Sequence, residues 1–301
     1  MEQTWKFHRG EALWVNIEYQ NASVIDELQK KYHLDDEILA YTLDKDERAR
    51  VEYDAITATF LLVFNVPHQL QAASHYDTSP ITFVVKENYL FSFVSQQTAY
   101  VSQLMAVILK QNPDLSIYEL LFKVLFRIAD GYFPLIEEVN SQWTKLNQRL
   151  RKKATNQNLL ELADLEIDLV YLVTATKQNA ILLQQMKALT IFRALTPSEQ
   201  EQLDDALIEA QQAVEMTQLA AQVMEQLSSA YNNVLNNNLN DTMKFLTVWS
   251  LLLTIPTLVT GFFGMNLPLP FADSILGWGV AVILSLLLAI WMILLLWRRI
   301  R

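Results

Sequence analysis

The sequence predicts an α/β cytosolic domain, followed by a long helical hairpin, a stalk helix and two transmembrane helices. Three observations lead to this fold class. Residues 1–115 contain short alternating or β-branched runs, residues 116–244 carry apolar side chains at helical spacing, and residues 245–297 hold two long apolar segments. Strands, amphipathic helices and membrane spans have these three different patterns.

Residues 1–115 alternate between strand and helix patterns. Strands are expected at 14–19 and 57–64, and a hairpin is expected from 81–85 and 89–94, because these runs are rich in β-branched and aromatic residues and bounded by turn residues. A helix is expected at 23–31, where Ser can cap and two acidic residues occupy the first turn.

Residues 116–195 are expected to form a cytosolic helical hairpin, and residues 196–244 a stalk helix. Apolar residues recur at steps of three and four in 117–143 and 159–192. At 195–199, Thr196 can cap a helix, Pro197 suits its first turn and Glu199 completes a capping box. No Gly or Pro follows until Pro256, so an unbroken helix would measure roughly 85–90 Å at about 1.5 Å per residue.

The stalk also carries a heptad-like stripe, which predicts packing against a sister helix or the preceding hairpin. Small and hydroxylated members favour a bundle over a two-stranded coiled coil. The stripe consists of Leu203, Leu207, Ala210, Val214, Thr217, Ala221, Met224, Ser228, Tyr231 and Leu235.

Residues 245–264 and 277–297 are each long enough to span about 30 Å of hydrocarbon. Trp278 and Trp297 lie at the ends of the second span, where indole rings favour the interface. Basic residues precede the first span and fill the tail at 298–301, so the positive-inside rule places both termini in the cytoplasm and 265–276 in a short outer loop. With no apolar run after Met1, no signal peptide is expected, and the chain is assigned to the cell (inner or plasma) membrane.

Composition excludes several function classes. The 301-residue chain is 51% hydrophobic, has a net charge of -10 and lacks cysteine. Without Lys244, Asp273 and the three tail arginines it retains 19 basic and 32 acidic residues, a balance that repels nucleic acid and attracts cations. Four of the six glycines fall within 261–279, so there is no phosphate-binding loop for a nucleotide. The four scattered histidines form no metal-ligand spacing, and we expect neither an enzyme nor an organic cofactor.

The first span has one face of polar or small residues. Its members recur at steps of three and four and are Asn240, Met243, Thr247, Ser250, Thr254, Thr257, Gly261 and Gly264, with Asn233 and Asn236 extending the face into the stalk. Small and hydroxylated residues can simply let helices approach closely. A polar path through the whole membrane instead indicates a water-filled pore, which needs several copies of the helix.

At the end of this face stands Gly261-Phe262-Phe263-Gly264-Met265-Asn266. Here the chain resembles the CorA family of divalent-cation transporters, whose signature is Gly-Met-Asn after the first of two C-terminal spans. The resemblance extends over the order of domains and includes the Asn-rich segment from Tyr231 and the span with Pro256. It implies a funnel-shaped homopentamer in the lipid bilayer.

The resemblance also implies roles for individual residues. Gly264, Met265 and Asn266 match the ring that selects hydrated Mg2+ at the outer mouth. Pore positions are matched by Asn240, Met243, Leu246 and Thr257, with Met243 and Leu246 at a hydrophobic constriction. Gly264, Asn266 and Asn240 are the expected metal-contacting positions. Neutral oxygens suit an ion that sheds water reluctantly and must be released again.

Two positions depart from the family pattern. Thr254 stands where a pore Met is common, and Ser229 where an acidic residue can sit. The outer loop carries one carboxylate, Asp273, which is either a cation attractor or a solvated loop residue.

The expected function is entry of Mg2+, with Co2+ or Ni2+ as further candidates, into the cytoplasm down its electrochemical gradient. The resemblance to the CorA family also implies that cytosolic Mg2+ closes the pore by bridging carboxylates between subunits. The sequence leaves open which carboxylates do this; candidates are Asp35, Asp36, Glu37, Asp204 and Asp205.

Two alternatives stay open. One is a zinc transporter of the same superfamily, with or without proton coupling, although no His or Cys lines the proposed pore to favour softer ions. The more distant one is a membrane-anchored sensor or scaffold, which would need neither the polar face nor the Gly-Met-Asn signature.

Overall fold

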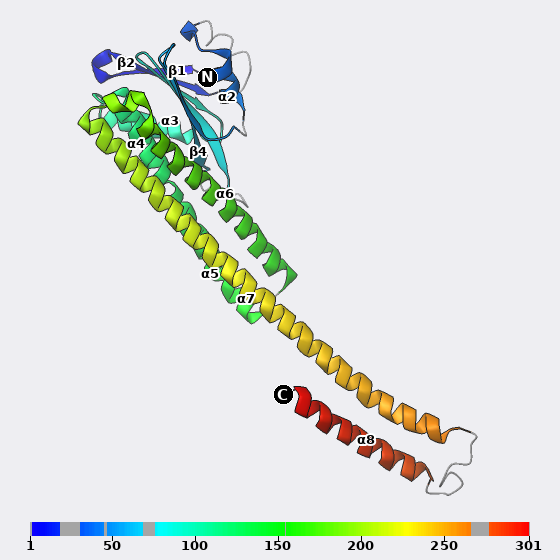
Figure 1. Cartoon of the computed structure of the whole chain (residues 1–301). Coiled ribbons are helices and arrows are strands. Elements are labelled where there is room, and N and C mark those ends of the chain that lie inside the picture. The colour runs from blue at the N-terminus through cyan, green and yellow to red at the C-terminus, as the bar shows by residue number, and fades with distance from the viewer. Residues whose placement is uncertain are drawn as a thin grey trace. The chain divides into compact units, whose positions relative to one another are not determined.

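The computed structural model of the chain describes residues 2–18, 31–44, 47–68, 76–153, 155–265 and 277–300. The chain forms two compact units, Met1–Leu227 and Ser228–Arg301. The first contains a six-stranded sheet with its helices, and the second contains two long apolar helical segments (Figure 1). Residues 23–30 of the helix expected at 23–31 lie outside the described residues.

The first unit is built on one mixed sheet with the strand order β1-β2-β6-β5-β4-β3. β2 and β6 are parallel, and the other neighbouring pairs are antiparallel. β2, β4 and the β5–β6 hairpin confirm the expected strands, whereas the edge strands β1 and β3 were not expected. The bounds are β1 Glu2–Phe7, β2 Ala12–Glu18, β3 Arg50–Asp54, β4 Thr59–Pro67, β5 Thr78–Lys86 and β6 Tyr89–Val94.

The central strands are covered on both faces, which explains their continuous apolar runs. All nine residues of β4 are buried, as are five consecutive residues of both β5 and β6. Sheets with two buried faces need such runs rather than strict alternation. On one face, Val15 and Ile17 form a core with Leu34 and Leu39 from the α2 region. α3 and α6 contact the sheet through β6 and β4.

Seven α-helices lie in the described residues, and they correct two expectations. The predicted helix at 117–143 is two helices separated at Gly131, and α3 was not expected at all. The segment predicted as helix to residue 192 ends at 188 and continues as a short 3-10 turn, Thr190–Ala194. The bounds are α2 Asp36–Leu43, α3 Tyr100–Gln111, α4 Ile117–Asp130, α5 Tyr132–Lys152, α6 Asn156–Ala188, α7 Pro197–Phe263 and α8 Gly277–Ile300.

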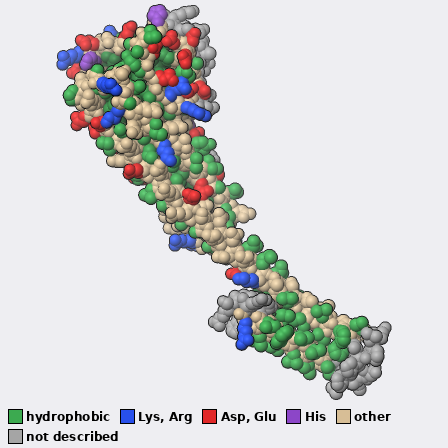
Figure 2. All heavy atoms as spheres, in the orientation of Figure 1, with side chains coloured by type: hydrophobic (Ala, Val, Ile, Leu, Met, Phe, Trp, Pro, Cys, Tyr) green, Lys and Arg blue, Asp and Glu red, His purple; other side chains and the backbone are tan. Residues whose placement is uncertain are grey.

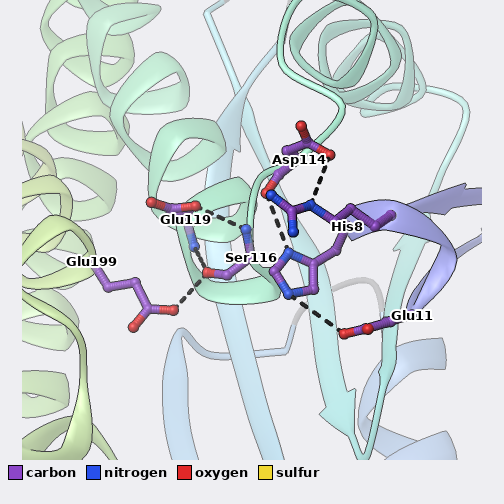
Figure 3. Close-up of polar contacts among 7 residues, drawn as sticks. His8, Glu11, Asp114, Ser116, Glu119 and Glu199 are labelled. Carbon is purple, nitrogen blue, oxygen red and sulfur yellow. Dashed lines mark hydrogen bonds and ion pairs between the residues drawn. The ribbon is translucent and has the colours of Figure 1, made fainter.

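The first turns of α4 and α7 share their capping groups (Figure 3). In α4, Ser116 Oγ accepts the Glu119 N–H at 3.1 Å, and Glu119 accepts the Ser116 N–H at 2.8 Å. In α7, Thr196 and Glu199 form the same reciprocal pair at 3.3 and 2.8 Å, which confirms the predicted capping box. Ser116 Oγ also donates to Glu199 at 2.5 Å, and Ser198 Oγ donates to Glu119 at 2.8 Å. Each carboxylate therefore helps to hold both helix starts.

The buried seam of α7 lies one residue away from part of the predicted stripe. Leu203, Ala210, Thr217 and Met224 are buried as expected. The remaining buried positions are Ala206, Ala213 and Ala220, whereas the predicted Leu207, Val214, Ala221 and Ser228 are only partly buried. Alanine at alternate positions of the seam lets neighbouring helices approach closely.

Polar contacts fix the register between α6 and α7. The hydroxyl oxygens of Thr176 and Thr217 are 3.0 Å apart, and both residues are buried. Closer to the end of α6, Lys187 Nζ donates to Asp204 at 2.5 Å. The two helices are therefore antiparallel, and each residue of α6 has a defined level on α7.

A buried polar network joins the sheet to α5 and α6. The Asn65 N–H donates to Asn179 Oδ1 at 2.9 Å, and Asn179 Nδ2 donates back to the Asn65 carbonyl at 2.8 Å. Tyr132 OH donates to that same carbonyl at 3.0 Å. Complete burial raises the pKa of Tyr132 well above 10, with a smaller contribution from Tyr100 nearby.

This burial predicts a loss of stability in alkali. Below pH 10 Tyr132 is neutral in both the folded and the unfolded chain, so it adds no pH dependence. Above pH 10 only the unfolded chain loses the Tyr132 proton, and the free energy of unfolding falls by about 1.4 kcal/mol per pH unit for that group. Tyr132→Phe should remove this contribution, and at pH 8 it should cost only about 1 kcal/mol because Asn179 still donates to the Asn65 carbonyl.

The measurement is urea unfolding of the full chain in detergent between pH 8 and pH 11.5, followed by tryptophan fluorescence. For each protein, the free energy of unfolding is plotted against pH. Lysine deprotonation contributes equally to the slopes of wild type and variant, so the difference between the two slopes isolates the contribution of Tyr132. Equal slopes would contradict the assigned burial.

Candidate functional site

The second unit carries the two candidate membrane spans. The C-terminal part of α7 and most of α8 are long and apolar enough to cross a membrane, and in the most apolar stretch of α7 the side chains are at least partly accessible, except Val259, which is 7% exposed. Green apolar side chains cover most of this unit in Figure 2, whereas acidic and basic side chains gather over the N-terminal unit. The apolar surface of the second unit therefore suits lipid or further copies of the chain.

One face of α7 in this unit is partly covered, and another is bare. The covered face includes Val248, Leu252, Ile255, Val259 and Phe263, which recur at helical spacing. α8 runs beside this part of α7 (Figure 1). The predicted polar face lies elsewhere around the helix, and every member of it is exposed: Asn233, Asn236, Asn240, Met243, Leu246, Thr247, Ser250, Thr254, Thr257, Gly261 and Gly264.

The hydroxyl groups of the polar face all donate to their own helix. Thr247 donates to the Met243 carbonyl at 2.8 Å and Ser250 to that of Leu246 at 2.9 Å. Thr254 and Thr257 bond in the same way to the carbonyls four residues earlier, at 2.8 and 2.9 Å. This local bonding uses the hydroxyl proton and leaves oxygen lone pairs outside the helix. The face therefore presents hydrogen-bond acceptors at four successive levels.

Below the hydroxyl groups, Asn240 and Met243 border a hollow of about 520 Å3. Lys244 lies on the same hollow, where its Nζ donates to Asp241 at 3.0 Å. Sequence reasoning did not single out Asp241. The sequence pattern that could have indicated it is an Asp and a Lys three residues apart, just before the first span.

The upper end of the polar face is formed by glycines. The Gly264 N–H donates to the Thr260 carbonyl at 2.9 Å and ends the helix. A Cβ at Gly264 would lie 3.2 Å from that carbonyl oxygen, whereas one at Gly261 would meet open space. Met265 follows and is exposed. Asn266 and Asp273, which complete the predicted outer site, lie outside the described residues.

The candidate regulatory carboxylates belong to the first unit. Asp35 and Glu37 border a hollow of about 460 Å3 that Glu52 and Asp54 also line. Asp36 begins α2 beside them. These acidic residues come from segments apart in the sequence, which the fold brings together.

The two carboxylates on α7 have basic neighbours instead. Asp204 pairs with Lys187, and Asp205 lines a hollow of about 250 Å3 together with Lys123 and Arg127. Within the part of the chain that the structure describes, no three His, Asp or Glu residues are grouped to hold a metal ion. The side-chain oxygen atoms of the polar face belong to Asn, Ser and Thr residues and are neutral.

Comparisons with known proteins agree with this architecture. Residues 9–299 match the family described as CorA-like Mg2+ transporter protein. The cobalt/magnesium transport protein CorA of Methanocaldococcus jannaschii is 22% identical over 284 residues, which cover 92% of this chain and 87% of that protein.

Solved structures show the same fold. The complete structure of the CorA magnesium transporter from Methanocaldococcus jannaschii has a TM-score of 0.79 at 21% identity and covers 97% of this chain and 92% of its own. The ZntB cytoplasmic domain from Vibrio parahaemolyticus has a TM-score of 0.57 at 12% identity, covering 76% and 88%. With its mixed α/β domain, long helix and two candidate spans, and a family match over nearly its whole length, the chain belongs to the CorA-like Mg2+ transporter family.

Proposed function

We propose that this protein is a homopentameric channel that carries Mg2+ into the cytoplasm down its electrochemical gradient. The observation that carries the proposal is the bare face of α7, where neutral oxygen acceptors follow one another through the apolar span. Membership of a Mg2+ transporter family supports the choice of a divalent cation.

One helix cannot enclose an aqueous path, so the proposal requires several copies around an axis. Polar groups facing hydrocarbon are costly, and a shared water-filled centre removes that cost. Five copies follow from the resemblance to the CorA family. The basic residues that flank the spans support a cytoplasmic position for both termini.

The acceptors on this face suit a hydrated cation. Water molecules bound to Mg2+ direct their hydrogens outward, and they can donate to the free lone pairs of Thr247, Ser250, Thr254 and Thr257. The ion keeps its shell, which it exchanges slowly. Neutral oxygens hold it weakly enough for release, as conduction requires.

Selection is proposed to occur at the outer end, where Gly264, Met265 and Asn266 of five copies form a ring. The Asn266 amide and the Gly264 carbonyl would accept hydrogen bonds from the ion's water shell, and Asn240 would do so again at the inner end. Asp273 would raise the local concentration of cations by its charge. Transport needs no ATP, because a dication crossing 100 mV gains about 4.6 kcal/mol, twice the unit-charge value.

Gating is assigned to the apolar pair Met243 and Leu246, which are 59% and 62% exposed on the bare face. A ring of such side chains can close a narrow pore by excluding water. Thr254 is polar, so no second apolar ring is proposed at its level. Cytosolic Mg2+ bound between carboxylates of neighbouring subunits would stabilise the closed state.

Flux in liposomes tests the proposal directly. Purified protein should pass Mg2+ down its gradient, faster with a negative interior, and the passage should not require a pH gradient. The assay uses a Mg2+-sensitive dye inside the vesicles, with Zn2+ and a zinc dye in parallel. Saturable Zn2+ uptake with negligible Mg2+ passage would show that the transported ion is Zn2+ rather than Mg2+. The absence of flux of any divalent cation would favour a sensor or scaffold.

Asn266→Ala should abolish Mg2+ uptake and leave expression and oligomer size unchanged, because the side chain is proposed to contact the ion's water shell rather than a core. Asn238→Ala is the matched control, since Asn238 is exposed and lies off the polar face. Uptake by both variants is compared at equal protein in the same liposomes. Full activity of Asn266→Ala would remove Asn266 from the proposed selectivity ring.

A further inference from the structure

α6 carries apolar side chains on two separate faces. One face packs inside the first unit and includes Leu169, Leu172 and Leu183, all nearly inaccessible to solvent. The other face holds Leu160, Ile167, Val170, Tyr171 and Ile181, which are 51–66% exposed. A helix that is apolar on nearly all sides is normally buried on all of them.

The exposed residues of α6 form a continuous row, termed the α6 stripe: Leu160, Ala163, Ile167, Val170, Tyr171, Thr174 and Ile181. From first to last the stripe covers about 32 Å at about 1.5 Å per residue. Contiguous apolar surface of this kind marks an interaction site rather than a free surface. Something outside the single chain is therefore needed to cover it.

α7 offers a second uncovered row in the same unit. Ile208, Met216, Leu219 and Val223, termed the α7 stripe, are 40–62% exposed. They lie on the side of α7 away from the buried seam, so the chain's own core cannot reach them. The two stripes differ in sequence and belong to different helices.

The register of α6 and α7 places matching residues at the same level. The Thr176–Thr217 contact and the Lys187–Asp204 pair fix this register. Moving along α6 toward its start corresponds to moving along α7 toward its end. Val170 is therefore level with Val223, and Thr174 is level with Leu219.

We propose that the α6 stripe of one copy packs against the α7 stripe of the neighbouring copy. The inference rests on the proposed function only in taking the chain as a cyclic homo-oligomer. Rotation about an axis along α7 keeps every residue at its own level, so Val170 meets the neighbour's Val223 without any sliding. Because the two stripes are different surfaces, the contact is head-to-tail, and with the cyclic symmetry taken from the proposed function it closes into a ring.

Charges at the edges of the stripes agree with this pairing. Lys177 borders the α6 stripe, and Glu215 borders the α7 stripe near the same level. Both are exposed, and among the described residues neither has an ion-pair partner. Across the proposed interface the ammonium and the carboxylate face each other, which favours the correct register over a shifted one.

The chain has no cysteine, so introduced pairs can be tested without background. The test variant is Val170→Cys with Val223→Cys in the full-length protein in membranes, treated with a mild oxidant and run on a non-reducing gel. We expect a ladder from dimer up to the closed ring, because a disulfide forms only between Cα atoms within about 7 Å. Either single substitution should stay monomeric on the gel.

The matched control is Val170→Cys with Glu225→Cys. Glu225 is exposed and lies only about 3 Å further along α7, and at 3.6 residues per turn its side chain points to the other side of the helix from Val223. It should give no ladder. In the assembled protein Val170→Cys alone should also lose its reactivity with a water-soluble maleimide, while Ile56→Cys, at a position that is 95% exposed, keeps it.

The outcomes separate the interface from the channel. An oligomer of unchanged native mass that passes Mg2+, yet gives no ladder and leaves the thiol of Val170→Cys reactive, would overturn the interface and leave the proposed function standing. A monomeric particle would overturn both. A ladder from the Val170–Val223 pair alone supports the interface whatever ion the protein carries.

Discussion

Hydrogen bonds from side-chain hydroxyls to the helix's own carbonyls are the interaction on which the membrane part of this protein depends. In hydrocarbon, each unsatisfied polar group costs several kcal/mol, so a span with five hydroxyl groups is tolerated only if their protons are bonded. The bonds from Thr247, Ser250, Thr254, Thr257 and Thr260 to carbonyls four residues earlier meet that requirement within one helix. They also leave the remaining oxygen lone pairs pointing outward. These lone pairs can accept hydrogen bonds from the water shell of a hydrated cation.

The soluble unit uses buried polar contacts for a different purpose. Asn65 and Asn179 bond the sheet to α6, and Thr176 bonds α6 to Thr217 on α7. Buried polar pairs add little net stability but penalise any other register, because a shifted helix would leave them without partners. These contacts connect the α/β core to α7 through a single helix, α6.

Much of the fold could be predicted, and the misses have physical causes. Strand β2, the β5–β6 hairpin and the Thr196 cap carry local signals that do not depend on tertiary contacts. The break at Gly131 was missed because apolar spacing continues across it. In the α7 seam, periodicity alone could not separate Leu207 from Ala206, and the smaller residue is buried because the neighbouring helices come close. α3 lies at the end of the region assigned to the α/β domain, between strand β6 and residue 116, and no helix was predicted there.

For the candidate site, the residues that share one face of the span could be predicted, and their role in ion passage stays a prediction. The polar face of the span follows from spacing alone, since a continuous helix fixes which residues share a side. Spacing could not show where the hydroxyl protons go or that another face is the one lying beside α8. It also could not reveal the α6 stripe, because apolar residues on a helix are usually assigned to the core of its own chain.

The central claim is that the hydroxyl face of α7 meets water in the assembled protein. The most direct test is to place single cysteines along the span, at Thr247, Ser250, Thr254 and Thr257, and at the apolar positions Trp249 and Phe262 as controls. The account predicts that a membrane-impermeant thiol reagent modifies the first group and blocks Mg2+ flux, while the controls stay unmodified. Modification of Trp249→Cys and Phe262→Cys, with no reaction at the hydroxyl positions, would contradict it.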